Sequence, residues 1–170
     1  VYFAVANSGA DAGIEVTASH NPINYNGMKI VKSGSRPLTL EEFLQIKSIA
    51  EEDNFALSSN PGQLDDIHKK VRMQYIKKIV NFVNYNSLKP LQIVLNSGNG
   101  VAGPIIDELE RYLNRKGVET RFIKVHHEPN SSFPHGIPNP LLQKNRAATS
   151  EVVKAANADL GVAFDGDFDR

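Results

Sequence analysis

Short stretches of alternating apolar and polar residues characterise the first part of the chain. Residues 13–17 (Gly-Ile-Glu-Val-Thr) alternate and are rich in β-branched side chains, so they predict a short strand. Residues 28–31 (Met-Lys-Ile-Val) predict a second strand. Thr39 is followed three residues later by Glu42, which is the pattern of a capping box, and this predicts a helix that continues to about Glu52.

Beyond a turn-rich link at 58–62 (Ser-Ser-Asn-Pro-Gly), helical and extended patterns alternate along the chain. The predicted elements are a long helix over 65–84, a strand over 91–95, a helix over 104–116 that ends at Gly117, a strand over 120–125, a helix over 150–157 and a strand over 160–164. This alternation predicts an α/β fold with three-layer α/β/α units and mixed, mostly parallel sheets. We place a domain boundary in the link, which gives domains at 1–62 and 63–170.

Composition narrows the class of protein. The 170 residues contain 19 Lys plus Arg and 19 Asp plus Glu, so the formal net charge is zero. A balanced charge argues against nucleic acid and an anionic membrane as partners, and no apolar run reaches the roughly 20 residues that span a bilayer. Because the chain has no cysteine, disulfides, thiolate nucleophiles and Cys-ligated metal sites are excluded, which fits a cytoplasmic protein.

The two ends of the sequence suggest a part of a longer protein. The chain begins at Val1 without a methionine or a signal-type segment. It stops at Arg170, directly after an acidic loop. We therefore expect an interior piece.

The most specific chemical signal is the segment 165–170 (Asp-Gly-Asp-Phe-Asp-Arg), which follows an apolar strand. Asp165, Asp167 and Asp169 are spaced so that a turning loop brings their carboxylates together, where they repel unless a cation lies between them. Carboxylate oxygens at the end of a strand suit Mg²⁺. An EF-hand is excluded because Arg170 stands where that loop requires glycine, and the alternative is a solvated acidic turn.

A second candidate is the loop over 17–22 (Thr-Ala-Ser-His-Asn-Pro), with Lys29 shortly after it. Ser19 would need activation to act as a nucleophile. Neighbouring side chains in an extended loop point apart, so His20 is not an obvious base for Ser19. A hydrolase triad lacks its Gly-x-Ser-x-Gly elbow here, and a loop serine that only makes hydrogen bonds remains the alternative.

The segment 98–103 (Gly-Asn-Gly-Val-Ala-Gly) matches the Gly-x-Gly-x-x-Gly fingerprint of dinucleotide-binding proteins, between a predicted strand and a predicted helix. Glu128 follows the next strand, but it lies later than the acidic residue of that fingerprint. The alternative is that the glycines allow a tight turn and close packing of helix and strand.

The loops at 17–22 and 165–170 together resemble the α-D-phosphohexomutase family, whose phosphoserine loop reads Thr-Ala-Ser-His-Asn-Pro and whose metal loop reads Asp-Gly-Asp-x-Asp-Arg. Both motifs stand intact and in the family's order. The segments 13–16, 96–100 and 133–140 look most like the bacterial phosphomannomutase branch. The resemblance implies a four-domain parent, of which this chain covers the later part of domain 1 and most of domain 2.

The resemblance also implies residue roles. Ser19 would be the phosphoserine, and it would hold one Mg²⁺ together with three aspartates through a phosphate oxygen. Lys29 would be the general acid/base, His20 would flank the reacting phosphate, and Arg170 would neutralise its charge. The metal ligands would be Ser19, Asp165, Asp167 and Asp169.

The implied activity interconverts mannose 6-phosphate and mannose 1-phosphate in the cytoplasm and supplies GDP-mannose synthesis. Phosphoserine would donate to the sugar phosphate, and the resulting hexose 1,6-bisphosphate, also the activator, would turn round and rephosphorylate the serine. The partners are therefore small sugar phosphates. The alternatives are a phosphoglucomutase or a dual-specificity enzyme and, more distantly, an NAD-binding oxidoreductase; the isolated fragment is expected to be inactive.

Overall fold

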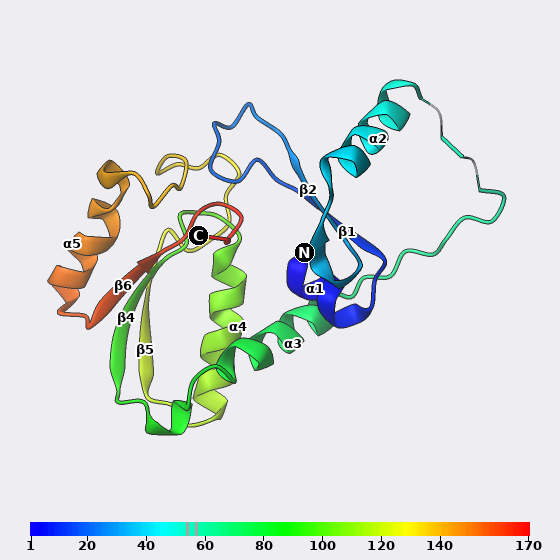
Figure 1. The fold of residues 1–170 in the computed structure, drawn as a ribbon. Coiled ribbons are helices and arrows are strands. Elements are labelled where there is room, and N and C mark those ends of the chain that lie inside the picture. Colours follow the sequence, from blue (N-terminus) through cyan, green and yellow to red (C-terminus); the bar gives the residue numbers. More distant parts are fainter. Residues whose placement is uncertain (54, 57) are drawn as a thin grey trace. The chain divides into compact units, whose positions relative to one another are not determined.

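A computed structural model describes residues 1–53, 55–56 and 58–170 (Figure 1). The chain forms two compact units. The first unit contains Val1–Val16 and Gly27–Val71, and the second contains Thr17–Asn26 and Arg72–Arg170. The predicted boundary after residue 62 follows chain order alone and stays a prediction, whereas the compact units assign the loop 17–26 to the second unit.

The first unit contains a three-stranded antiparallel sheet in the order β1-β2-β3. Its elements are α1 (Tyr2–Ser8), β1 (Ala12–Val16), β2 (Met28–Lys32), a 3₁₀ helix (Ser33–Ser35), β3 (Arg36–Pro37) and α2 (Leu40–Glu51). The strands at 13–17 and 28–31 are thus confirmed, while α1 and β3 were not predicted. The strands of this sheet are antiparallel because β1 and β2 follow each other without a crossover helix; the mostly parallel sheet was expected from the alternation beyond residue 62.

The capping box at the start of α2 is confirmed. The Thr39 hydroxyl accepts from the Glu42 backbone N–H at 3.2 Å, and the Glu42 carboxylate accepts from the Thr39 N–H at 2.7 Å. The Lys32 ammonium donates to both Glu42 oxygens at 2.7 and 2.8 Å. These bonds lower the pKa of Glu42 to about 2, and the bond from Lys32 contributes most.

The second unit is built around a parallel sheet in the order β5-β4-β6. Its elements are α3 (His68–Val80, which begins in the first unit), a 3₁₀ helix (Tyr85–Ser87), β4 (Leu91–Asn96), α4 (Ala102–Arg115), β5 (Thr120–Val125), a second 3₁₀ helix (Gln143–Asn145), α5 (Ala147–Ala156) and β6 (Leu160–Ala163). Helices α4 and α5 cover opposite faces of this sheet (Figure 1). The α/β class and the parallel sheet are therefore confirmed.

Alternation along β4 explains the two covered faces. Leu95 points to one face and packs with Ala102 and Ile106 of α4. Asn96 points to the other face, where its amide donates to the hydroxyl of Thr149 in α5 at 3.0 Å. Because β4, β5 and β6 run parallel, their carboxyl ends lie at the same edge of the sheet. Open α/β sheets place their ligands at this edge.

Helix α3 is shorter at both ends than the predicted helix over 65–84, so those bounds were wrong. At its start, Asp66 accepts from the His68 backbone N–H at 3.1 Å in the manner of a cap. At its end, Val80 is the last buried residue that packs against α4, and Phe82 beyond it is 73% exposed. No helix among the described residues has the length and apolar character of a membrane span.

Candidate functional site

The loop 17–26 holds Ser19 in an uncommon backbone conformation. Its φ is 54°, in the left-handed region that residues with a Cβ rarely adopt. The Ser19 backbone N–H donates to the Thr17 hydroxyl at 2.8 Å, and the Asn21 N–H donates to the Ala18 carbonyl at 3.0 Å. These two local bonds hold the turn, and backbone strain of this kind is concentrated at functional sites.

The acidic loop after β6 is fixed by its first carboxylate. Asp165 is completely buried, and its Oδ1 atom accepts from the backbone N–H groups of Asp169 and Arg170 at 3.1 and 3.2 Å. Phe168, with a φ of 65°, sets its ring edge-on to that of Phe164 with 4.7 Å between centroids. The loop therefore turns back on itself, and Phe164 and Phe168 pack against the hydrophobic cluster beneath α4.

The two loops meet within the second unit. The Ser19 hydroxyl lies 3.0 Å from Asp165 Oδ2 and 3.2 Å from Asp167 Oδ1. The Thr17 hydroxyl donates to Asp167 Oδ2 at 3.0 Å. A Cβ at Gly166 would lie 2.9 Å from the Ser19 carbonyl oxygen, so glycine permits this close approach. The structure thus brings together the serine and the acidic loop that the sequence singled out separately.

The three aspartates fit a divalent cation. Asp165, Asp167 and Asp169 each present a ligand atom within 4.8 Å of the others. The Arg170 guanidinium lies 3.9 Å from Asp165 and 3.7 Å from Asp169, which offsets only part of three negative charges. A set of oxygen donors with one fully buried member suits Mg²⁺. These residues are the ones that would hold the ion.

His20 lies close to Ser19, contrary to the expectation that neighbouring side chains point apart. Its Nδ1 atom is 3.2 Å from the Ser19 hydroxyl, because the left-handed backbone at Ser19 turns the loop. Its Nε2 atom is 3.4 Å from the Arg170 guanidinium, which can only donate. A neutral His20 that accepts at Nε2 carries its proton on Nδ1, so it donates toward Ser19 rather than acting as its base.

Lys29, the expected general acid/base, lies on β2 in the first unit, opposite Glu15 in the antiparallel register. The serine loop belongs to the second unit, so Lys29 and Ser19 lie in different compact units. Its proposed role therefore stays a prediction.

The glycine turn at 98–103 packs closely against its neighbours. A Cβ at Gly100 would lie 2.6 Å from the Gly166 carbonyl oxygen, and one at Gly103 would collide with the His127 carbonyl. The Val101 N–H donates to the same Gly166 oxygen at 3.1 Å. These glycines therefore provide the tight turn and close packing given above as the alternative, and the turn supports the acidic loop.

Two histidines of the loop after β5 form a pair beside the glycine turn. The rings of His126 and His135 stack with 3.7 Å between centroids, and His135 Nδ1 lies 2.8 Å from the Asn99 side-chain oxygen. Burial, followed by the charge of His135, lowers the pKa of His126. The sequence places both histidines in one loop at a spacing that fits no zinc site, but it does not predict their stacking, because stacked rings have no fixed spacing.

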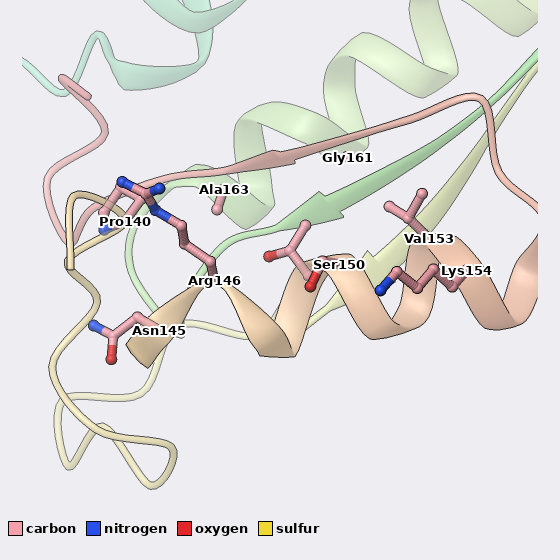
Figure 2. A pocket seen from close by; sticks show the side chains of 9 residues that line it. Pro140, Asn145, Arg146, Ser150, Val153, Lys154, Gly161 and Ala163 are labelled. Atoms are coloured by element: carbon pink, nitrogen blue, oxygen red, sulfur yellow. The ribbon is translucent and has the colours of Figure 1, made fainter. Parts of the chain in front are cut away.

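A separate cavity of about 390 Å³ lies along α5 and β6 (Figure 2). It is lined by Pro140, Asn145, Arg146, Thr149, Ser150, Val153, Lys154, Gly161 and Ala163. Arg146 and Lys154 supply its two cationic groups. None of the predicted site residues lines it.

Comparison with known families gives two matches along the chain. Residues 73–170 match the model of phosphoglucomutase/phosphomannomutase α/β/α domain II, and residues 1–57 match the model of α/β/α domain I of the same proteins. Over its whole length the chain is 46% identical to a phosphomannomutase of Vibrio cholerae, aligned over 173 residues, and spans 36% of the length of that curated relative.

Solved structures give the same picture of the fold. A putative phosphomannomutase from Thermus thermophilus superposes with a TM-score of 0.78 at 28% identity, covering 99% of this chain and 37% of that one. A phosphoglucomutase/phosphomannomutase family protein from Burkholderia thailandensis superposes with a TM-score of 0.76 at 30% identity, covering 93% of this chain and 32% of that one.

Proposed function

The chain belongs to the phosphoglucomutase/phosphomannomutase family, and on this premise we propose that the complete protein interconverts mannose 6-phosphate and mannose 1-phosphate through a phosphoserine at Ser19. The observation that carries the proposal is the Ser19 hydroxyl, 3.0 Å from the buried Asp165 in a cluster of three carboxylates. A hydroxyl in that position becomes a phosphate ester whose oxygens face a cation site.

Phosphoryl transfer needs alignment and neutralisation of charge more than covalent chemistry. Bound Mg²⁺ would supply that neutralisation at the phosphoryl oxygens. Arg170 adds a fixed positive charge at the same edge, 3.7 Å from Asp169. The Ser19 hydroxyl already points at the acidic loop, 3.0 Å from Asp165 and 3.2 Å from Asp167.

In the first half-reaction, a hydroxyl of the sugar phosphate attacks the phosphorus of phosphoserine. The new P–O bond to the sugar forms as the P–Oγ bond breaks, and the hydroxyl proton passes to a base, for which Lys29 is the candidate. The departing Ser19 oxygen takes a proton, and His20 Nδ1, 3.2 Å away, is placed to donate it. The regenerated hydroxyl then hydrogen-bonds to the aspartates as in the structure.

In the second half-reaction, the hexose 1,6-bisphosphate turns round and the Ser19 hydroxyl attacks the phosphorus of its other phosphate. The P–Oγ bond forms as the bond from phosphorus to the sugar oxygen breaks. The Ser19 proton returns to His20 Nδ1 and the sugar oxygen takes the proton held by Lys29, so no phosphate is consumed overall. Added hexose 1,6-bisphosphate therefore acts as an activator, because it rephosphorylates enzyme that has lost its phosphate. We assign the product to GDP-mannose synthesis in the cytoplasm.

The test uses the complete protein with Mg²⁺ and a hexose 1,6-bisphosphate. Turnover of mannose 1-phosphate and of glucose 1-phosphate is compared for the wild type, Ser19→Ala and the control Ser150→Ala, whose serine lies on α5. The proposal expects phosphate on Ser19 by mass spectrometry, a loss of turnover of at least about 10³-fold in Ser19→Ala, and none in the control. Full activity of Ser19→Ala would refute the proposal.

The ratio of the two rates decides the sugar. A mannose 1-phosphate rate well above the glucose 1-phosphate rate supports the assignment, whereas the reverse or equal rates identify a phosphoglucomutase or a dual-specificity enzyme. Phosphorylated Ser19 without turnover of either sugar would overturn the mannose assignment and retain the phosphoserine.

A further inference from the structure

Thr17 occupies a bridging position between the serine loop and the acidic loop. Its hydroxyl oxygen accepts from the Ser19 backbone N–H at 2.8 Å, and its single proton goes to Asp167 Oδ2 at 3.0 Å. We propose that the Thr17 hydroxyl is a positioning group that sets the orientation of Asp167 as a metal ligand and keeps it set when Ser19 is phosphorylated. This inference rests on the proposed function.

The direction of the Thr17 hydroxyl is fixed by its two partners. A backbone N–H can only donate, so the oxygen must accept there, and a carboxylate can only accept, so the proton must point to Asp167. With Oδ2 of Asp167 held in this way, Oδ1 is the atom turned toward Ser19, 3.2 Å from its hydroxyl. The bridge therefore determines which carboxylate oxygen faces the reacting group.

The bridge gains importance when Ser19 carries phosphate. The unmodified Ser19 hydroxyl has one proton, which it shares between Asp165 and Asp167, 3.0 and 3.2 Å away. Phosphorylation removes that proton and adds close to two negative charges, so both bonds are lost and the aspartates are repelled. The bond from Thr17 to Asp167 needs no proton from Ser19, so it persists in both states of the serine.

The same hydroxyl supports the backbone at Ser19. A φ of 54° is costly for a residue with a Cβ, and the bond from the Ser19 N–H to Thr17 offsets that cost. The Thr17 side chain thus holds both Ser19, which would carry the phosphoryl group, and Asp167, which would be one ligand of the cation. Groups that orient a metal ligand affect metal affinity by about 10- to 100-fold when they are removed.

The test compares the complete wild-type protein with Thr17→Val, which keeps the shape but has no hydroxyl, and with Thr17→Ser, which keeps the hydroxyl. Thr120→Val on β5 is the matched control. The first readout is the dissociation constant of Mn²⁺, measured by electron paramagnetic resonance without substrate. We expect it to rise about 10-fold in Thr17→Val and to stay near the wild-type value in Thr17→Ser and in the control.

The second readout separates positioning from substrate binding. In Thr17→Val, we expect kcat to fall while KM for the sugar phosphate changes little, because the hydrogen bonds of the Thr17 hydroxyl go to the two loops. Thr17→Ala replaces Thr17→Val if the latter does not fold. Unchanged Mn²⁺ affinity in the hydroxyl-free variant, or equal loss in Thr17→Ser, overturns the inference.

Failure of the proposed function gives a different pattern. A wild-type protein that carries no phosphate on Ser19 and has no metal-dependent turnover refutes the proposed function whatever the Thr17 variants do. A phosphorylated, metal-dependent wild type whose Thr17→Val variant binds Mn²⁺ normally refutes only the role of Thr17.

Discussion

The Ser19 hydroxyl lies 3.0 Å from the Oδ2 atom of Asp165, although 146 residues separate the two in the chain. The contact is made by a turn at each end: left-handed backbone at Ser19, and an acidic loop closed by two backbone bonds to Asp165 Oδ1. Because Asp165 is completely buried, the serine meets a carboxylate that the fold itself holds in place. The chain's own hydrogen bonds therefore hold the serine and the carboxylate together.

Removing one charge from the aspartate cluster should stabilise the metal-free protein. The three carboxylates have oxygens within 4.8 Å of one another, and like charges at that separation repel by on the order of 1 kcal/mol per pair. Asp167→Asn keeps an oxygen that accepts from Thr17. In a chelator, we expect its melting temperature to rise by about 2–4 °C.

The same variant should lose the response to metal. Mg²⁺ should raise the melting temperature of the wild type, since it binds the folded state alone, and should leave that of Asp167→Asn nearly unchanged. Asp11→Asn, at an exposed position of the first unit, is the control and should behave as the wild type. Equal Mg²⁺ responses in wild type and Asp167→Asn would argue against a cation among these aspartates.

Gly100→Ala should destabilise the second unit. Its Cβ would lie 2.6 Å from the Gly166 carbonyl oxygen, and the contact is with backbone, which cannot move aside without shifting the acidic loop. Overpacking of this kind costs about 1–3 kcal/mol, measured as the free energy of unfolding in urea. Gly62→Ala is the matched control, because no atom lies within 4 Å of its added methyl group. Similar stabilities for the two variants would contradict the packing role of Gly100.

Local patterns made most of the fold predictable. The pair Thr39 and Glu42 specifies the start of α2 through bonds that span three residues, so the sequence contains the whole signal. The acidic segment after β6 was recognisable for a similar reason, since its spacing and its place at a strand end are local. The bounds of α3 were wrong because its start is set by the cap at Asp66 and its end by where α4 stops covering it.

The missed features of the site depend on conformation and distant contacts. The approach of His20 to Ser19 arises from the φ of 54° at Ser19, a backbone conformation that a serine at this position does not predict. The bridge from Thr17 to Asp167 crosses between two loops far apart in the chain. The motifs identified the site residues, whereas the hydrogen bonds between them are seen only in the folded structure.

The ion pair at the start of α2 should make stability depend on acid pH. The pKa of Glu42 is lowered to about 2, mainly by its bond from Lys32, whereas it is 4.5 in the unfolded chain. The stabilisation is therefore fully present above pH 4.5 and is lost as the pH falls toward 2. Glu42→Gln should be less stable than the wild type at pH 7 and equal to it near pH 2. Glu41→Gln, its neighbour in the first turn, is the control. A difference that does not change with pH, in urea unfolding, would rule out this linkage.

The stacked histidines should produce a second pH dependence, nearer neutrality. Burial, and then the charge of His135, lower the pKa of His126 below 6.5, so the unfolded chain binds this proton more readily than the folded protein. Stability is thus retained above pH 6.5 and lost as the pH falls through the lowered pKa. His126→Asn removes the titrating ring, and asparagine tolerates the φ of 44° at this position. We expect the free energy of unfolding in urea to decline less between pH 7 and 5 in His126→Asn than in the wild type. Parallel declines in the two proteins would show that His126 does not contribute to the acid sensitivity of the second unit.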